Sequence, residues 1–331
     1  MKQVYEQMRP QVPYEEILRQ REKDGRRFYE LFSSCFETVR CPACGEAGRA
    51  AFEKYGFHHE SCPACGTLFC SPRPDEDALL KYYTEFASPK QWTQLLLRTD
   101  VERKALQYEP RVRSIIESLV RIGMSPGGAA VDIGAGSGAF ALSLKKSEFF
   151  SRVIALDLSP DCVSACERQG LEARIGTLGC EQGSSADFLS MNDLIEHVFD
   201  PAALLGECAR VLKKSGVLSI ATPNGEGFDF RILKKDTRNI TPPEHLTYFN
   251  RRSIKLLLKR CGFQEFFFAT PGKLDVAMIQ AEKKKGLDLS ERNEFLDLLF
   301  KEDEAVLESF QRFLAENRLS SHMLVLARKG A

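Results

Sequence analysis

The chain has 331 residues, 43% of them hydrophobic, which is enough for one full α/β domain and a smaller module. Its 46 Lys and Arg residues balance its 46 Asp and Glu residues, so no net charge attracts nucleic acid or an anionic membrane. The charged start lacks the apolar core of a signal peptide, and no stretch approaches the roughly 20 apolar residues of a membrane-spanning helix. These features predict a soluble cytoplasmic protein with no nucleic-acid or membrane partner.

The charged residues 1–38 predict an N-terminal helical arm. We expect a helix from Tyr14 to Phe32 that is interrupted at Asp24-Gly25. The arm should be solvated, lie on the following module and carry no chemistry.

Residues 39–74 contain two near-identical Cys-Pro-Ala-Cys-Gly segments in the pattern C-x2-C-x17-C-x2-C. Each segment brings two thiolates to one side of a tight turn, and two such turns complete the tetrahedron of a zinc ribbon. Four thiolates leave no position for water, so the zinc would be structural. The expected ligands are Cys41, Cys44, Cys62 and Cys65, with His58 and His59 as competing ligands. The few cations of this segment, Arg49 and Lys54, do not form a phosphate-binding face, which favours a docking or substrate-gating role.

Residues 75–125 predict a helical linker or lid. Helices are expected over 75–86 and 91–122, with a break near Pro110. The aromatic residues here, Tyr82, Tyr83 and Trp92, would either belong to a core or roof a bound cofactor.

The segment 131–140, Val-Asp-Ile-Gly-Ala-Gly-Ser-Gly-Ala-Phe, is the centre of the chain. It reads as a strand that feeds a glycine turn and then a helix, a pattern that exposes bare backbone and helix N–H groups to a nucleotide-like cofactor. Strands and helices then alternate. The expected strands are 129–133, 152–157, 172–175, 186–191, 217–221, 264–270 and 322–327. The last should close the sheet edge as the hairpin partner of 264–270.

Asp132 distinguishes between two cofactors. Gly134, Gly136 and Ala139 also fit a dinucleotide pattern, but a carboxylate beside them would repel a pyrophosphate. It suits S-adenosylmethionine, which carries a sulfonium and an ammonium group and no phosphate. Asp157, at the end of the next strand, is placed to accept hydrogen bonds from ribose hydroxyls or to cap the helix that follows.

Two histidines follow strands at the carboxyl edge, where open α/β sheets bind ligands. His245 lies in the polar loop 225–250 and is the first candidate for a general base, because its ordinary pKa is near neutral. His197 follows the fourth strand and is the second candidate. Either histidine could instead hold its loop in place.

The chain resembles class I S-adenosylmethionine-dependent methyltransferases, in the small-molecule branch that includes ubiquinone-type O-methyltransferases. The resemblance lies in the segment 131–140, in Asp157 and in the segment 192–201, which reads Asn-Asp-Leu-Ile-Glu-His-Val-Phe-Asp-Pro. The resemblance implies a Rossmann-like seven-stranded sheet with helices on both faces. It also implies the cofactor-binding residues, which are Asp132, Gly134, Ala135, Gly136, Gly138, Asp157, Leu158, Asn192 and Asp193. The zinc-binding front end, together with residues 244–249, resembles methyltransferases of sugar and cell-surface carbohydrate pathways.

The leading hypothesis is therefore methyl transfer to the oxygen, nitrogen or carbon of a small polar acceptor, with the cofactor domain in residues 126–331. The alternatives are an RNA or protein methyltransferase that reads its substrate through the ribbon, a non-catalytic cofactor-binding scaffold, and an NAD-dependent oxidoreductase. A helical insertion, residues 274–318, would form a lid or a homodimer surface.

Overall fold

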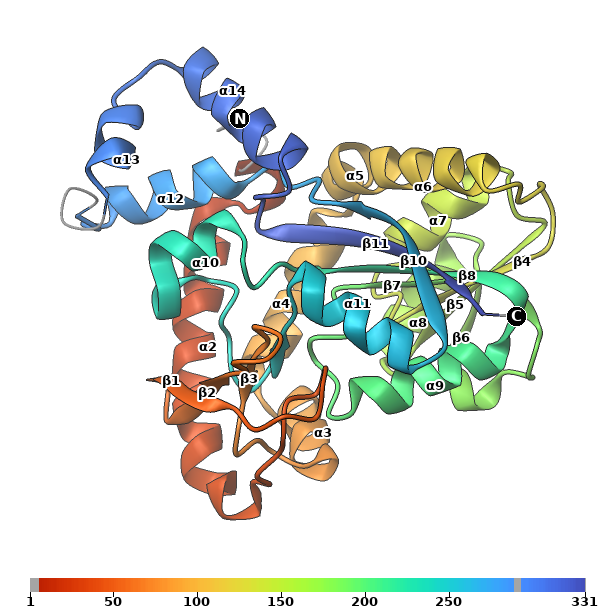
Figure 1. Ribbon diagram of the computed structural model, residues 1–331, viewed down its shortest axis with the longest axis horizontal. Coiled ribbons are helices and arrows are strands. Elements are labelled where there is room, and N and C mark those ends of the chain that lie inside the picture. Colours follow the sequence, from red (N-terminus) through yellow and green to blue (C-terminus); the bar gives the residue numbers. More distant parts are fainter. Residues whose placement is uncertain (1–5, 289–292, 331) are drawn as a thin grey trace.

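The computed structural model describes residues 6–288 and 293–330, and a seven-stranded sheet runs through its centre (Figure 1). The strand order is β10-β11-β8-β7-β4-β5-β6, with β4 to β8 parallel and β11 antiparallel to both of its neighbours. The strands are β4 (Ala129–Ile133), β5 (Arg152–Asp157), β6 (Glu172–Ile175), β7 (Ala186–Asn192), β8 (Leu212–Pro223), β10 (Phe263–Ala269) and β11 (His322–Lys329). The predicted α/β class and the seven-stranded sheet are confirmed.

Helices cover both faces of this sheet because successive strand residues point in opposite directions. Val131 and Ile133 of β4 join an apolar core with α9 and α11, whereas Ala130 joins a second core with α6 and α7. The helices concerned are α6 (Glu109–Arg121), α7 (Ala139–Lys146), α8 (Pro160–Arg168), α9 (Pro201–Val211) and α11 (Arg251–Arg260). The short turn η3 (Leu178–Cys180) connects β6 to β7.

Two details of the sheet differ from the prediction. The final strand, β11, pairs antiparallel with β10 as expected, but it also pairs with β8, so β10 and not β11 forms the edge. The strand expected over 217–221 begins five residues earlier, at Leu212, and includes residues 213–216. They belong to β8, where a register shift opposite Ala186 and the positive φ of Ser215 (62°) absorb the glycine-containing segment.

The N-terminal helix α2 (Gln11–Phe32) is continuous, so the expected interruption at Asp24-Gly25 is wrong. The Asp24 carboxylate accepts hydrogen bonds from the Gln20 side chain (2.7 Å) and the Ser88 backbone N–H (2.8 Å), which satisfies it within the helix. A side chain at Gly25 would lie 2.9 Å from the carbonyl oxygen of Pro242, so glycine allows a loop to pack closely. The helix is not a solvated arm, because Phe28 is fully buried among aromatic rings. Residues 1–5 of the predicted arm lie outside the described residues.

The segment that follows the ribbon is helical, but its break lies elsewhere. Pro110 occupies the first turn of α6, where a proline is tolerated, and the chain bends at Thr99 instead. The elements of this segment are α3 (Glu76–Glu85), α4 (Ala87–Arg98), α5 (Asp100–Arg103) and the π-helical turn η2 (Lys104–Tyr108), whereas the short turn η1 (Ser33–Cys35) precedes the ribbon.

The cysteine-rich segment forms three short strands, β1 (Arg49–Lys54), β2 (Phe57–Ser61) and β3 (Leu68–Cys70). A fourth strand, β9 (Thr247–Tyr248), comes from a distant part of the chain and pairs antiparallel with β3. The ribbon sheet is therefore completed by the polar loop that the sequence had assigned to the other domain. Figure 1 shows this small sheet beside α2, away from the central sheet.

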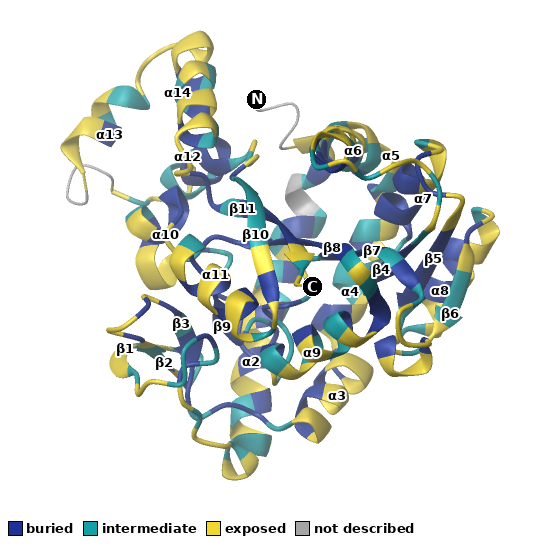
Figure 2. Ribbon diagram, turned by 45° about the vertical axis from the view of Figure 1, so that its right-hand side comes forward, coloured by how far each residue is buried: buried dark blue, intermediate teal, exposed yellow. Residues whose placement is uncertain are grey.

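A group of helices near the C-terminus packs around its own apolar cluster. It contains α10 (Phe228–Leu233), η4 (Lys234–Asp236), α12 (Asp275–Lys284), α13 (Glu294–Leu299) and α14 (Glu304–Glu316). The outer surfaces of α13 and α14 are largely exposed (Figure 2). Residues 289–292 of the predicted insertion lie outside the described residues. None of the described helices combines the length and hydropathy needed to cross a bilayer.

Candidate active site at the strand ends

The glycine loop between β4 and α7 has the backbone that its sequence predicts. Gly134, Gly136 and Gly138 have φ values of 66°, 55° and 83°, a region that favours glycine. A side chain at Gly138 would lie 2.7 Å from Cys166 Sγ, so the loop packs tightly on α8. Among the described residues, nothing lies within 4 Å of the position a Gly136 side chain would take. The Ala135 N–H donates to the carbonyl of Leu156 (2.9 Å), which fixes the loop over the end of β5 and leaves the backbone at Gly136 accessible.

Asp132 lies beneath this loop and is 2% exposed. Its Oδ1 accepts hydrogen bonds from Ser190 Oγ (2.7 Å) and Asn192 Nδ2 (3.4 Å), both on the neighbouring strand β7. Burial raises the pKa of Asp132 to about 7, because these two donors only partly offset the loss of water. A buried carboxylate of this kind gains from a nearby cation.

Asp157 ends β5 and joins two loops. Its Oδ2 accepts from the backbone N–H of Gly136 and its Oδ1 from that of Ser159, each at 2.8 Å. Ser159 is the residue that caps α8. Each carboxylate oxygen retains a further lone pair, so these bonds orient the group without exhausting it. The next side chain, Leu158, is 65% exposed.

Asn192 ends β7 beside Asp132, and Asp193 directly follows the strand. Asn192 Oδ1 accepts from Arg111 Nη1 on α6 (2.6 Å), and Asp193 Oδ1 lies 2.6 Å from His322 Nε2 on β11. Burial acts to raise the pKa of Asp193, but the charge and hydrogen bond of His322 outweigh it and hold that pKa below its usual range. The end of β7, on one side of Asp132, thus carries two polar contacts, one with Arg111 and one with His322.

The helix α5 reaches the same region, because Asp100 Oδ1 accepts a hydrogen bond from Ser137 Oγ at 2.5 Å. Ser137 belongs to the glycine loop. The helical segment that precedes the central sheet therefore contacts the predicted cofactor loop directly.

The two candidate histidines lie together although 48 positions separate them in the chain. Their ring centroids are 4.6 Å apart and the rings are nearly perpendicular. His245 Nδ1 lies 2.7 Å from the carbonyl oxygen of Asn239, and His197 Nδ1 lies 2.9 Å from the Tyr83 hydroxyl. Burial lowers the pKa of His197 to about 4, and burial, the facing His197 and Arg21 lower the pKa of His245 well below its usual range. Both imidazoles are therefore neutral at physiological pH.

Two glutamates next to these histidines behave differently. Glu196 is fully buried, and Thr222 Oγ1 donates to its Oε2 at 2.9 Å. Burial, with Asp193 nearby, raises the pKa of Glu196 well above its usual range. Glu244 forms a buried salt bridge with Arg21 on α2, with Nη2 and Oε2 2.7 Å apart. Glu244 therefore holds its loop against the N-terminal helix and does not contact the imidazoles through its carboxylate.

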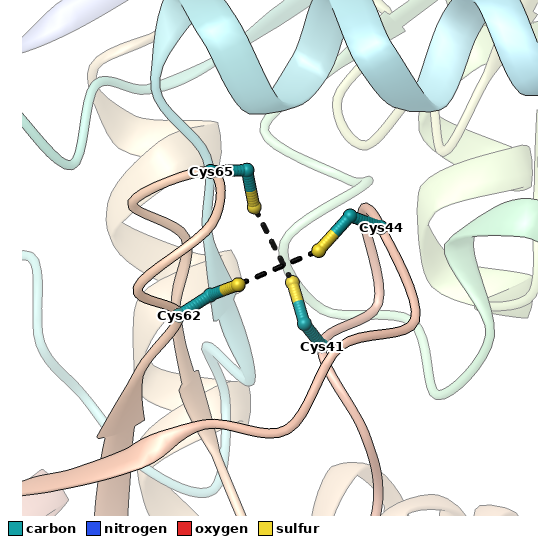
Figure 3. A group of neighbouring side chains, drawn as sticks. All are labelled: Cys41, Cys44, Cys62 and Cys65. Atoms are coloured by element: carbon teal, nitrogen blue, oxygen red, sulfur yellow. Dashed lines mark hydrogen bonds between the residues drawn. The ribbon is translucent and has the colours of Figure 1, made fainter.

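The four predicted zinc ligands converge on one point (Figure 3). Cys41 and Cys65 have their Sγ atoms 3.5 Å apart, and Cys44 and Cys62 have theirs 3.4 Å apart. Zinc–sulfur bonds of about 2.3 Å in a tetrahedron place sulfurs about 3.8 Å apart, so the cluster fits zinc with a small expansion. The competing ligands lie elsewhere, because His59 Nε2 lies 3.3 Å from Cys70 Sγ and His58 faces Glu53.

The cysteine cluster is joined to the loop that carries His245. The Asn250 side chain donates to the carbonyl of Cys65 (3.0 Å), and the backbone N–H of Cys70 donates to that of Leu246 (2.9 Å). Arg260 on α11 donates to the carbonyl of Ala43 at 2.6 Å. The knuckles of the ribbon therefore rest on the helix and the strand that directly follow His245.

Sequence reasoning missed four residues of this region, namely Tyr83 as a partner of His197, Asp100, Arg111 and His322. Arg111 and His322 lie 81 and 129 positions from their partners, so no local spacing indicated them.

Comparison with known families identifies part of the chain. Residues 105–265 match the family model described as a methyltransferase domain. The match contains the glycine loop, Asp157, Asn192 and both histidines, and it ends in β10. Residues 105–265, slightly less than half of the chain, are thus similar to a methyltransferase domain.

Two curated relatives have the name ubiquinone biosynthesis O-methyltransferase. The one from Xanthomonas oryzae pv. oryzae (strain PXO99A) is 34% identical over 107 residues, which cover 30% of this chain and 44% of the relative. The one from Xanthomonas axonopodis pv. citri (strain 306) is 29% identical over 158 residues, which cover 40% of this chain and 65% of the relative. The chain thus spans less than half of the first relative and less than two thirds of the second.

A solved structure shares the fold. It is the complex between the Haloferax volcanii Trm112 methyltransferase activator and a methyltransferase, with a TM-score of 0.50 and 16% identity. The match covers 72% of this chain and 98% of the other. At this identity the likeness concerns the fold alone.

Proposed function

We propose that this chain is an S-adenosylmethionine-dependent methyltransferase that acts on a small polar acceptor, such as a sugar. The observation that carries the proposal is that the methyltransferase-domain match, residues 105–265, includes the strands whose carboxyl ends hold the glycine loop and Asp157. Fold and match point to the same edge of the sheet, where α/β sheets bind their ligands.

The residues present fit this cofactor. The accessible backbone at Gly136 gives room for the ribose and methionyl part, and Asp157 offers lone pairs to the ribose hydroxyls. The exposed Leu158 would lie against adenine. The buried Asp132 supplies negative charge for the ammonium and sulfonium groups, and a pyrophosphate would be repelled there.

The cofactor, when bound, supplies an activated methyl group, so the chain mainly has to position the acceptor and exclude water. α5, held to the glycine loop through Asp100, and Tyr83 of α3, held to His197, close the region from one side. His245 Nδ1 is engaged by Asn239, so Nε2 is the atom through which His245 would accept an acceptor proton.

A polar acceptor is favoured by the charged and hydrogen-bonding groups at the strand ends. Asp193, His197 and His322 each use one polar atom in the contacts described above, and their remaining polar atoms would lose water without gaining a partner against an apolar molecule. Sugars present hydroxyl groups to such side chains.

Ligand-induced stabilisation tests the proposal. S-adenosylmethionine or its demethylated product, at 100 times its Kd, should increase the free energy of unfolding by about 2.7 kcal/mol and so raise the melting temperature. NAD should leave the melting temperature unchanged. Asp157→Ala should weaken cofactor binding roughly 10- to 150-fold, because each charge-assisted bond contributes about 1.5–3 kcal/mol. Asp161→Ala, an exposed change in the first turn of α8, is the matched control.

Turnover is then measured with cofactor carrying a labelled methyl group and a panel of sugars, sugar nucleotides and small phenols. Transfer of label to a polar acceptor supports the proposal. Stabilisation by NAD, indifference to S-adenosylmethionine at millimolar concentration, or unchanged affinity in Asp157→Ala would contradict it.

A further inference from the structure

We infer that Glu196, His197 and His245 form a second metal site, which binds a divalent transition-metal cation at the strand ends and is separate from the four-cysteine cluster. One potential ligand atom from each of the three residues lies within 4.8 Å of the other two. His197 Nε2 and Glu196 Oε1 are 4.0 Å apart. Metal–ligand bonds of about 2.0–2.2 Å span up to roughly 4.3 Å across an ion, so small side-chain rotations bring all three atoms to one cation.

The Glu196 carboxylate carries the independent observation. The side chain is fully buried, and its Oε2 accepts a hydrogen bond from Thr222. Its Oε1 has no hydrogen-bond partner in the part of the chain that the structure describes. A buried carboxylate oxygen without a partner is costly, and this oxygen lies toward His197. A bound cation would satisfy it.

In each of the three side chains, the polar atom that does not face the cluster is hydrogen-bonded to a neighbouring residue, as is usual for metal ligands. His245 Nδ1 lies against the carbonyl oxygen of Asn239, which accepts its proton and leaves Nε2 with a lone pair. Tyr83 engages His197 Nδ1, and Thr222 engages Glu196 Oε2. Each candidate ligand thus has one atom fixed by a second residue and another atom directed to the cluster.

The ligand set indicates the class of cation. Two imidazoles and one carboxylate suit zinc, iron(II), cobalt(II) or manganese(II), whereas calcium and magnesium favour sites built from oxygen. Three protein ligands leave positions open on the ion. The four cysteines present only sulfur and form a closed site, so the two centres differ in both chemistry and accessibility.

The position of the cluster extends the proposed function, and this step rests on it. Glu196 and His197 follow Asn192 and Asp193 by a few residues, at the edge where the cofactor would bind. With a cation bound, the Nε2 lone pair of His245 is a metal ligand and does not accept a proton, so the cation replaces His245 in activating the acceptor, whose oxygen atoms would take the open positions. An acceptor with two neighbouring oxygens, such as a vicinal diol or catechol, would fill two of them.

Cobalt(II) binding tests the site without any acceptor. Protein first loaded with zinc at the cysteines is titrated with Co²⁺, and the visible d–d absorption is followed. We expect one equivalent to bind without the strong sulfur charge-transfer bands that thiolate ligands produce. Glu196→Gln, which keeps the size of the side chain, and His245→Ala should each weaken binding at least about tenfold.

His58→Ala removes an exposed ribbon histidine and should leave the titration unchanged. The thermal shift by S-adenosylmethionine is measured on every variant, which shows that each one is folded and tests the proposed function separately. The inference is overturned if the zinc-loaded native protein binds no Co²⁺, or if Glu196→Gln and His245→Ala retain the native affinity and spectrum. Loss of Co²⁺ binding with a preserved cofactor shift supports it.

Discussion

The hydrogen bonds of Ser190 and Asn192 only partly offset the cost of burying the Asp132 carboxylate. The protonation of Asp132 therefore couples pH to cofactor binding. Its pKa of about 7 means that the folded protein holds a proton more tightly than the unfolded chain, in which the pKa is near 3.9. The stability this proton gives is fully present below pH about 4 and is lost as the pH rises through about 7. A positively charged cofactor favours the ionised form, so cofactor and proton compete.

We therefore expect S-adenosylmethionine affinity to increase about tenfold between pH 6 and pH 8, as the ionised fraction of Asp132 rises from about a tenth to about nine tenths. Calorimetric titrations across this range measure the effect. Asp132→Asn should bind more weakly and lose most of the pH dependence. A steep pH dependence that survives in Asp132→Asn would show that another group is responsible.

For single residues, the sequence predicted those features that depend on neighbouring positions in the chain. The positive φ values of Gly134, Gly136 and Gly138 follow from a strand–turn–helix pattern of neighbouring residues. The partners of Asn192 and Asp193 do not, because Arg111 and His322 reach them only once α6 and β11 have packed on the sheet. The roles of His197 and His245 in catalysis remain predictions.

The element that departs most from expectation is the ribbon. From sequence alone it is a separate module, and Cys41→Ser should unfold it without effect on the cofactor domain. Phe69 and the knuckle cysteines instead share an apolar core with Phe249 and Ile254 of that domain. A two-residue strand such as β9 has too little pattern to be predicted, and its pairing with β3 depends on tertiary contact.

Loss of the cysteine site should therefore spread to the loop that carries His245. We expect Cys41→Ser to speed backbone hydrogen exchange in residues 41–70 and also at Thr247–Tyr248, because β9 loses the ordered partner β3. β4 and β5 should stay protected, and the thermal shift by S-adenosylmethionine should persist.

Mass-spectrometric hydrogen exchange measures this effect, with Cys35→Ser as the control because Cys35 is exposed and outside the cluster. If residues 41–70 exchange rapidly while Thr247–Tyr248 remains as protected as in the native protein, the two segments are not coupled. The strands β4 to β7 were predictable, because each is a short run that alternates regularly with a helix or turn along the chain. The continuity of α2 was not predictable, because Ser88 and the Pro242 loop override the local signal of Asp24-Gly25.

Across the whole molecule, the N-terminal helix holds together parts that are far apart in the chain. Arg21 is 9% exposed, contacts both carboxylate oxygens of Glu244, and stacks on Trp92 with 4.4 Å between the guanidinium carbon and the ring centroid. Tyr82 on α3 donates to the same carboxylate at 3.0 Å. α2, α3 and α4 are thereby fixed to the residue that precedes His245.

Removal of one partner of this ion pair should be far more damaging than removal of both. Arg21→Met leaves Glu244 buried and unpaired, which should lower the free energy of unfolding by about 3–5 kcal/mol, whereas the double variant Arg21→Met/Glu244→Leu should recover most of that loss. Arg26→Met is the matched control, because Arg26 pairs with Glu22 at the surface and should contribute at most about 1 kcal/mol. Urea unfolding followed by far-UV circular dichroism measures all three variants. Equal losses for Arg21→Met and Arg26→Met would mean that the buried pair does not anchor the helix, and that the loop before His245 owes its position to β9 and the ribbon alone.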